Sequence, residues 1–380
     1  MKNFAPPRRL QGIQKSLIRQ VFDRALPGSL NLGLGEPDLP TPDVVREAAI
    51  RVIREEQNGY TSHAGLPALR EEIASEYEYL NRDKDRVIVT AGSQEALYLA
   101  LLSIVDEGDE VLLPNPGFVA YPTIVQMAGG KAVFYELPAV EDFSFDIESF
   151  RRALTPRTRA VVCISPSNPT GRVLSIEDLA AIADALKDHD AYLISDEIYR
   201  ELYYDPERPA SATSFHDRTI VISGLSKSVS MTGWRLGWIC GEPSVIKTAL
   251  VLHGYVTTCA SAVSQKASLA AWSDEAESAR AFFRQTFKTR RDHLLDLIKT
   301  QLDLRAVTPD GAFYTLVDVS KYGSSMEVAE ALLQERLITV PGSAFGSQGE
   351  GYLRVSFCAH LDALSEGVKR MRKAFAAYKL

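Results

Sequence analysis

The sequence has few cysteines, and none of them stands at a spacing typical of metal ligands. Four occur among 380 residues, with no CxxC pair and no histidine at ligand spacing: Cys163, Cys240, Cys259 and Cys358. We therefore predict that the chain holds no metal. Cys163 and Cys240 lie within apolar runs, which indicates buried thiols, and a reducing, cytoplasmic location is the simplest inference.

The sequence also lacks a long apolar run, an excess of positive charge, an internal repeat and a low-complexity tract. No apolar segment approaches the roughly 20 residues that span a bilayer. Lysine and arginine total 42 and aspartate and glutamate 49, which gives a formal net charge of −7. An acidic balance gives no general attraction to nucleic acid or to anionic membranes, so we expect neither as a partner. A local basic pocket for a small anion is compatible with this balance.

The start of the chain lacks acidic residues, because no aspartate or glutamate precedes Asp23. It carries these basic residues: Lys2, Arg8, Arg9, Lys15 and Arg19. Basic starts without acids occur in transit peptides. However, Pro6 and Pro7 would break an early amphipathic helix, and no secretory apolar core follows. We predict an N-terminal arm.

Short β-rich runs alternate with helical patterns from about residue 87 onward. The strand candidates are residues 87–90, 110–113, 132–137, 160–165, 191–195 and 219–223. Residues 93–105 and 175–188 have helical patterns, the second with Ser175 as N-cap and Asp178 three residues on. This alternation predicts an α/β fold with a mostly parallel sheet covered on both faces. Ligands of such sheets bind at the carboxyl ends of the strands.

The two ends of the chain are organised differently, which predicts a second, smaller α+β domain. A mostly helical stretch runs from about 262 to 300, and strands are expected at 311–319 and 352–357. Thr41 and Pro42 have the form of an N-cap and a first helical residue. We predict an N-terminal arm joining the small domain over residues 1–40, a large domain over 41–280 and a small C-terminal domain over 281–380.

Residues 223–238 are the most informative segment. Lys227 follows a β-rich run, lies among small hydroxyl residues and precedes Arg235 by eight positions. A lysine that forms an imine needs a desolvated strand-end position that lowers its pKa. An arginine with nearby hydroxyls can hold a phosphate ester. The spacing alone leaves a solvated loop with a scattered lysine and arginine equally open.

Four other polar features lie in or after predicted strands. Residues 91–96 join a strand to a helix, whose first turn offers unpaired N–H groups to a phosphate. Asp196 ends an apolar run and, once buried, needs a cationic partner. Asn168 lies in a rigid Asn-Pro turn, and Arg354 in an alternating strand. Taken alone, these features also fit an ordinary β-to-α connection, an acid that begins a turn, a structural turn and an exposed edge arginine.

Together these segments resemble the motifs of the class I and II aminotransferases, which belong to fold type I of the pyridoxal-phosphate enzymes. The resemblance extends from residues 31–38 to 352–357, with the motifs in the family's order and spacing. It implies a three-layer aminotransferase fold, pyridoxal 5′-phosphate as cofactor, and Lys227 as the residue that forms the internal aldimine and acts as general base and acid. The class of reaction is a ping-pong exchange between an L-amino acid and a 2-oxo acid, with 2-oxoglutarate as one expected partner.

The resemblance also assigns the other site residues. The phosphate is held by the N–H groups of Ser93 and Gln94, by Arg235, by Tyr60 of the neighbouring subunit and by Ser226 or Ser223. The ring is held by Asp196 at the pyridine nitrogen, by Asn168 and Tyr199 at the ring oxygen, and by Phe118 on its face. The substrate carboxylate is held by Arg354 beside Gly35, with Asn168. Tyr60 makes a homodimer with shared active sites the expected assembly.

Three departures from the family's pattern bear on the details. Gly224 stands where many members have serine, which leaves the hydroxyl that meets the phosphate open. Phe118 replaces tryptophan, so stacking survives but the indole N–H is lost. Gln94 replaces a lysine of some aspartate-using relatives, which weakens an aspartate preference.

The peptides Asn115–Pro116 and Asn168–Pro169 are expected to be cis.

Two alternatives to an aminotransferase follow from the same resemblance. A carbon–sulfur β-lyase or an aminocyclopropane-carboxylate synthase-like lyase would use the same residues. A pyridoxal-phosphate-sensing transcription regulator would carry a DNA-binding domain ahead of the fold, and the roughly 30 residues before Asn31 are too few for one. None of the six histidines matches a catalytic position of the family.

Overall fold

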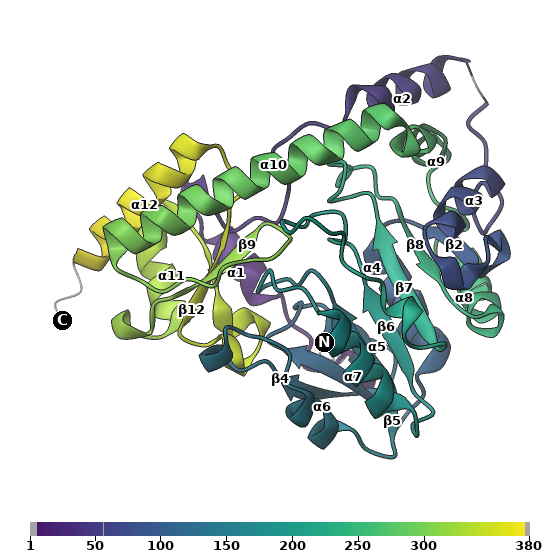
Figure 1. The fold of residues 1–380 in the computed structure, drawn as a ribbon, viewed down its shortest axis with the longest axis horizontal. Coiled ribbons are helices and arrows are strands. Elements are labelled where there is room, and N and C mark those ends of the chain that lie inside the picture. The colour runs from purple at the N-terminus through teal and green to yellow at the C-terminus, as the bar shows by residue number, and fades with distance from the viewer. Residues whose placement is uncertain (1–5, 56, 377–380) are drawn as a thin grey trace, which may run out of the picture.

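The computed structural model describes residues 6–55 and 57–376 of the chain. Its larger part is built on a seven-stranded sheet with the order β2-β8-β7-β6-β5-β3-β4 (Figure 1). The strands are β2 (Val87–Thr90), β3 (Glu110–Asn115), β4 (Lys131–Glu136), β5 (Thr158–Ile164), β6 (Tyr192–Asp196), β7 (Thr219–Gly224) and β8 (Gly237–Cys240). All six runs predicted from the sequence form strands of this sheet.

Strand β8 was not predicted, and it is the one antiparallel member of the sheet. It pairs antiparallel with both β2 and β7, whereas the other neighbours pair in parallel. The strand is four residues long and begins with Gly237. A short run that opens with glycine gives little strand signal in a sequence.

Helices cover both faces of the sheet and make three layers. Ile194 and Ile222 pack with α4 and α8 on one face, and the adjacent Leu193 packs with α6 and α7 on the other. Successive residues of a strand point to opposite faces, which produces this division. The helices of this part are α2 (Asp43–Glu55), α3 (Pro67–Ser75), α4 (Ser93–Ile104), α5 (Tyr121–Met127), α6 (Ile147–Ala153), α7 (Ile176–Leu186), α8 (Pro243–Val256) and α9 (Ala262–Ser268).

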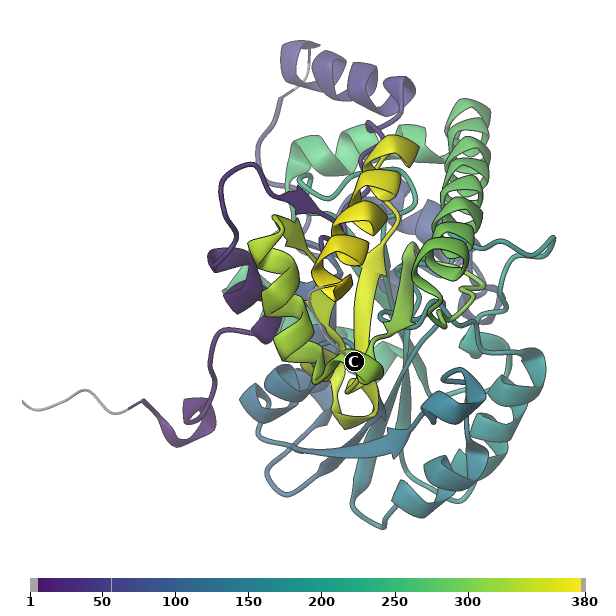
Figure 2. The ribbon, with the colours of Figure 1, turned by 90° about the vertical axis from the view of Figure 1, so that its left-hand side faces the viewer.

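The smaller part combines a three-stranded antiparallel sheet with helices. Its elements are α10 (Asp274–Leu297), β9 (Tyr314–Asp318), α11 (Ser325–Gln334), β10 (Leu337–Ile338), β11 (Val340–Pro341), β12 (Tyr352–Ser356) and α12 (Leu361–Ala376), with sheet order β11-β12-β9. The arm contributes α1 (Leu17–Asp23) and β1 (Leu30–Asn31), and β1 pairs in parallel with β10 (Figure 2). Helix α10 runs through residue 280 without a break, so the predicted boundary there stays a prediction.

Two local predictions at helix starts have different outcomes. Ser175 caps α7 and forms a reciprocal capping box with Asp178, as expected. Thr41 does not cap α2, which begins at Asp43. Its hydroxyl instead donates to the carbonyl of Ser230 at 2.7 Å, because that turn lies against the start of the helix. Within the described residues, no helix is long and apolar enough to cross a membrane.

Candidate active site

The carboxyl ends of the parallel strands border a cavity of about 400 Å³. Strand β6 ends at Asp196, β7 leads into the turn that carries Lys227, and β5 leads into the turn that carries Asn168. The start of α4, strands β9 and β12 and the arm complete the lining. Among the lining residues are Gly35, Ser93, Gln94, Phe118, Asn168, Asp196, Tyr199, Ser226, Lys227, Arg235 and Arg354. Of the site residues expected from the sequence, Tyr60 and Ser223, the alternative to Ser226, lie outside this lining.

Lys227 projects into this cavity from a buried turn. Its Nζ donates to the carbonyl of Gly35 at 2.7 Å. Burial lowers the pKa of the lysine amine to about 8, since the charged form loses hydration there. A fraction of the amine is therefore neutral near neutral pH, which is the form that reacts as a nucleophile or a base.

Asp196 is a buried acid with no cationic partner among the described residues. Its Oδ2 accepts a hydrogen bond from the Tyr121 hydroxyl at 2.8 Å, and its Oδ1 accepts one from the N–H of Ile198 at 3.2 Å. Burial raises the pKa of this carboxyl to about 6, although both hydrogen bonds act in the opposite direction. A cation placed against Asp196 would restore the charged carboxylate.

Arg354 is a buried cation without a carboxylate partner in the described part of the chain. The residue is 3% exposed. Its Nη1 donates to Asn168 Oδ1 at 2.7 Å and its Nη2 to the carbonyl of Gly33 at 2.6 Å, while Nε has no partner. Burial lowers the pKa of the guanidinium. Because a buried charge needs compensation, this geometry calls for an anion from outside the chain.

A second arginine faces the start of α4. Gly92 is the N-cap residue of this helix and has φ +93°, and a Cβ there would lie 2.4 Å from Arg235 Nη2. Only glycine fits this position. The Arg235 guanidinium donates to the carbonyls of Thr232 at 3.1 Å and Ala91 at 3.5 Å and pairs with no carboxylate among the described residues. The helix start and Arg235 thus form one cationic cradle.

Two tyrosines that the sequence did not single out complete the site. The hydroxyl oxygen of Tyr314 in β9 lies 2.8 Å from that of Tyr199. The Arg354 guanidinium carbon lies 4.3 Å from the centroid of the Tyr314 ring. A Cβ at Gly35 would overlap the Tyr314 hydroxyl, so a glycine is needed there. Tyr121, which holds Asp196, packs edge-on against Phe118 at 5.4 Å between ring centroids. The one sequence signal for Tyr121 was its position three residues after Phe118, a residue already assigned to the site.

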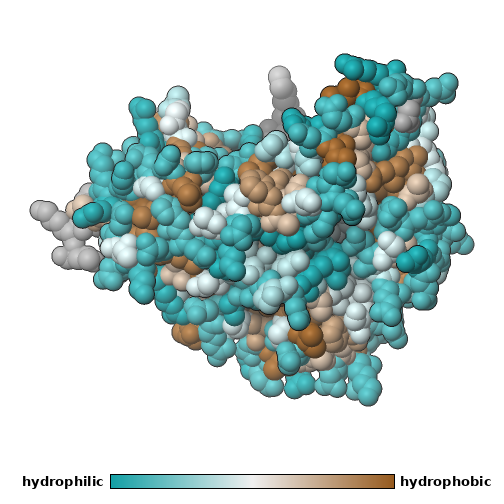
Figure 3. Space-filling model, turned by 45° about the horizontal axis from the view of Figure 1, so that its top comes forward, coloured by the Kyte–Doolittle hydropathy of each residue, from teal (hydrophilic) through white to brown (hydrophobic). Residues whose placement is uncertain are grey.

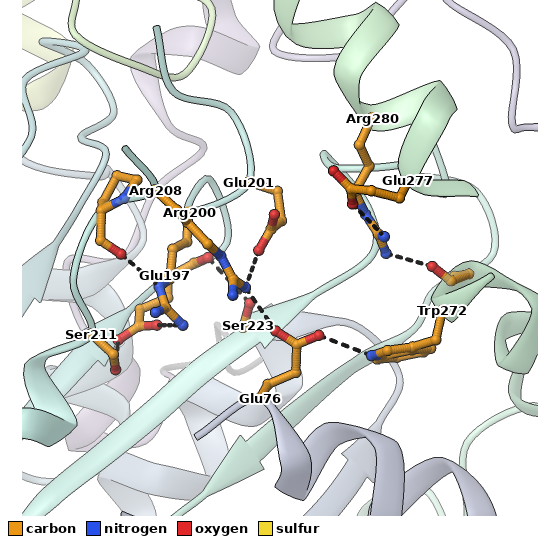
Figure 4. Close-up of polar contacts among 12 residues, drawn as sticks. Glu76, Glu197, Arg200, Glu201, Arg208, Ser211, Ser223, Trp272, Glu277 and Arg280 are labelled. Carbon is orange, nitrogen blue, oxygen red and sulfur yellow. Dashed lines mark hydrogen bonds and ion pairs between the residues drawn. The ribbon is translucent and has the colours of Figure 1, made fainter. Parts of the chain in front are cut away.

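A polar network supports the strand end beneath the Lys227 turn (Figure 4). The hydroxyl of Ser223 in β7 donates to the backbone carbonyl of Glu197 at 3.2 Å. The Glu197 carboxylate accepts from Ser211 at 2.6 Å and lies 3.4 Å from Arg200. Glu197 follows Asp196 directly, so the two side chains point to opposite faces, and this network leaves the cavity itself free.

One of the two expected cis peptides was placed wrongly. Asn115–Pro116 is cis, as predicted, but the second cis bond is Ser165–Pro166. Asn168–Pro169 lies inside a tight turn that the N–H of Gly171 closes to the Ser167 carbonyl at 2.9 Å. The cis bond lies ahead of this turn, at the end of β5. Within the described residues, no group of three or more His, Cys, Asp or Glu is placed to hold a metal.

Comparison with known proteins identifies the family to which this fold belongs. The chain matches the family "Aminotransferase class I and II" over residues 27–369. It is 37% identical to a probable aspartate aminotransferase of Methanocaldococcus jannaschii, over 97% of this chain and 99% of the relative. It is 38% identical to the aspartate/prephenate aminotransferase of Thermus thermophilus, over 96% of this chain and 97% of that one.

Solved structures give the same result. The Thermus thermophilus aspartate aminotransferase with maleate superposes with a TM-score of 0.92 at 36% identity, covering 98% of this chain and 100% of that one. The match over residues 27–369 and the similarity to these relatives over nearly the whole chain show the family. The protein is a member of the class I and II aminotransferase family, a pyridoxal-phosphate-dependent family, and the lyases of the same fold are not favoured.

Proposed function

We propose that the cavity binds pyridoxal 5′-phosphate and exchanges amino groups between an L-amino acid and a 2-oxo acid, with 2-oxoglutarate as one partner. The observation that carries this proposal is the charge balance of the cavity. The buried Arg354 has no carboxylate partner among the described residues, and the buried Asp196 has no cationic one. Arg235 is exposed beside the start of α4, where its guanidinium contacts two backbone carbonyls and no carboxylate of the described chain. A cofactor with a phosphate and a basic ring nitrogen, together with a substrate carboxylate, compensates all three.

The residues present fit this cofactor. We place its phosphate at the N–H groups of Ser93 and Gln94, at Ser226 and at Arg235. The ring nitrogen then meets Asp196, the ring oxygen meets Asn168 and Tyr199, and Phe118 covers the ring face. When bound, the cofactor supplies an electron sink for charge that develops at the substrate Cα. Asp196 as an anion keeps the ring nitrogen protonated and thus maintains that sink.

Lys227 moves the proton in this proposal. Its amine, with a pKa lowered to about 8, would remove the proton from the substrate Cα and hold it at Nζ for its return. The Gly35 carbonyl, which accepts from Lys227 Nζ, orients the amine in the cavity. Burial of the turn excludes water, which would otherwise compete for this proton.

Arg354→Lys is expected to lower kcat/KM for every amino donor by a similar factor. Lysine keeps the charge but loses the planar fork that meets two carboxylate oxygens. The loss should be about 1.5–3 kcal/mol, as for hydrogen bonds to charged groups. Acidic, apolar and aromatic donors are assayed with 2-oxoglutarate, and Arg280→Lys, a buried arginine outside the cavity, serves as control. A loss confined to acidic donors would show that Arg354 reads the distal carboxylate.

The same panel tests the donor class. Ile18, Phe22 and Leu34 line the side of the cavity formed by the arm, and we place the donor side chain against them. Arg19 also lines this side, but its guanidinium is paired with Asp23 at 3.2 Å. Gln94 adds no positive charge there. We therefore expect aromatic donors to exceed aspartate in kcat/KM. Both donor classes occur among relatives with 35–38% identity, which include an aromatic-amino-acid aminotransferase of Thermococcus litoralis and the aspartate/prephenate enzyme. A faster reaction with aspartate than with aromatic donors would contradict this assignment.

We also propose a cytoplasmic homodimer with shared sites. Tyr60 is 89% exposed and Tyr255 is 91% exposed, an unusual condition for tyrosines of a folded chain. Further apolar surface lies at the end of the molecule that carries α2, whose Ile53 is 63% exposed (Figure 3). A second copy related by a two-fold axis would cover this surface and bring Tyr60 to the partner's cofactor. The free cysteines support a reducing compartment.

Mixing two inactive variants, Tyr60→Ala and Arg235→Ala, should restore part of the activity once the subunits exchange. Some heterodimers then contain one site with both wild-type groups. The activity of the mixture is followed alongside a tagged-subunit assay of exchange. Demonstrated exchange without any recovery of activity would contradict shared sites.

A further inference from the structure

Glu95 supports the cationic cradle that the start of α4 and Arg235 form. It is the third residue of α4, and its side chain is 9% exposed. Its Oε2 accepts the N–H of Ala91 at 2.5 Å. Its Oε1 lies 2.9 Å from His253 Nδ1 and also accepts from the Thr257 hydroxyl. The family assignments place none of these three side chains in the site.

We infer that Glu95, held by His253 and Thr257, is a positioning residue that sets the affinity of the chain for the cofactor phosphate. This inference rests on the proposed cofactor. The contacts of Ala91 carry it, because both polar groups of that residue are held. Its N–H is bound by Glu95, and its carbonyl accepts from Arg235 at 3.5 Å. Ala91 therefore joins the two halves of the cradle.

The helix start needs such support because its N-cap is a glycine. Gly92 has no side chain to accept the first N–H groups of α4, which leaves those of Ser93 and Gln94 directed at the cavity. Glycine also leaves the backbone free to move. A glutamate at the third helical position usually binds the N-cap N–H. Glu95 reaches one residue further back, so it fixes the Thr90–Ala91 peptide, while Arg235 binds the carbonyl of the peptide that joins Ala91 to the glycine.

A carboxylate this close to a phosphate site must also be compensated, since like charges repel. Burial raises the pKa of Glu95, but hydrogen bonds from His253, Thr257 and Ala91 outweigh burial and leave that pKa lowered. His253 is fully buried, comes from α8 and, like Glu95, does not line the cavity. The negative charge of Glu95 is thus compensated by its hydrogen-bond donors outside the cavity lining.

The test compares two cofactors that form the same bond with Lys227. Apoprotein is titrated with pyridoxal phosphate and with pyridoxal, which lacks the phosphate, and binding is followed by absorbance. Glu95→Ala should weaken pyridoxal phosphate by about tenfold or more, as for a lost hydrogen bond to a charged group, and change pyridoxal by less than about twofold. Glu95→Gln, whose amide oxygen can still accept the Ala91 N–H, should bind within about threefold of wild type.

Glu110→Gln is the matched control. Glu110 is also a buried glutamate held by a threonine and by cations. It lies at the start of β3, at the amino ends of the parallel strands, whereas the cavity lies at their carboxyl ends. This variant should lower the melting temperature without changing the preference for the phosphate. Thr257→Val, a milder change, should weaken pyridoxal phosphate selectively even if Glu95→Ala does not fold.

Each outcome decides one question. Equal weakening of both cofactors, unchanged or tighter binding of pyridoxal phosphate, or equal losses in Glu95→Gln and Glu95→Ala would overturn the positioning role. Failure of the wild type to bind pyridoxal phosphate would instead refute the proposed cofactor. A selective loss in Glu95→Ala and Thr257→Val, with rescue by glutamine, supports the inference.

Discussion

Lys227→Ala is expected to abolish transamination and the absorbance of the bound imine. The variant loses both the amine that bonds to the cofactor and the group that moves the Cα proton, and proton transfer alone contributes about 10²–10⁴-fold. Turnover is measured with the best donor of the panel and 2-oxoglutarate, and the imine by its visible band. Lys131→Ala is the control, because Lys131 pairs with Glu110 far from the cavity. A coloured, active Lys227→Ala protein would refute the assignment.

The lowered pKa of Lys227 adds a pH signature to this prediction. The amine is protonated below pH 8 and neutral above it, given a pKa of about 8. The rate at which added pyridoxal phosphate forms the imine with apoprotein should therefore rise with pH and level off above about 8. A midpoint near 10.5, the ordinary value for lysine, would mean that the side chain is solvated in solution.

Asp196→Asn is expected to slow the half-reaction with an amino donor by about 10²–10³-fold, as for the loss of one electrostatic stabiliser of a transition state. Asparagine keeps the shape of the side chain but cannot hold a protonated ring nitrogen by charge. A single-turnover measurement isolates this step from product release. An unchanged half-reaction rate would remove Asp196 from the proposed mechanism.

The same substitution should stabilise the apoprotein. The folded-state pKa of Asp196 is about 6, above its ordinary value of 3.8. Such a group stabilises the fold fully below pH 3.8, and this contribution is lost as pH rises through 6, because the folded protein must then bury a charge. Above pH 6 the apo form of Asp196→Asn should be more stable than wild type by about 3 kcal/mol. Denaturant titrations at pH 4 and pH 7.5 test this, since the gain should vanish at the lower pH.

The sequence predicted those features of the fold and site that depend on local patterns. The alternation of β-rich and helical runs located all six parallel strands. The parallel sheet then placed Asp196, Lys227 and Asn168 at one edge, because parallel strands end on the same side. The arginines and Phe118 came from the family resemblance, since their spacing alone was uninformative.

The parts that the sequence did not predict depend on contacts between distant residues. Tyr121 meets Asp196 across 75 positions, Tyr314 meets Tyr199 across 115, and His253 meets Glu95 across 158. No local pattern marks such pairs. The cis bond at Ser165–Pro166 was missed because two prolines follow this strand closely, and their spacing does not distinguish which one takes the cis form.

The C-terminal end of α8 carries one residue that contacts Glu95 and another that lies on the molecular surface, and this arrangement has a thermodynamic consequence. His253 points inward to Glu95, while Tyr255, two residues on, is almost fully exposed on the surface proposed for subunit contact. In the proposed dimer, a partner that fixes this helix end would also fix the donors of Glu95, and cofactor binding and subunit association would then be linked equilibria. Linkage is reciprocal: if the dimer binds the cofactor more tightly than the monomer, the cofactor tightens the dimer by the same factor. Dilution should therefore release cofactor, and adding cofactor should reassemble the dimer.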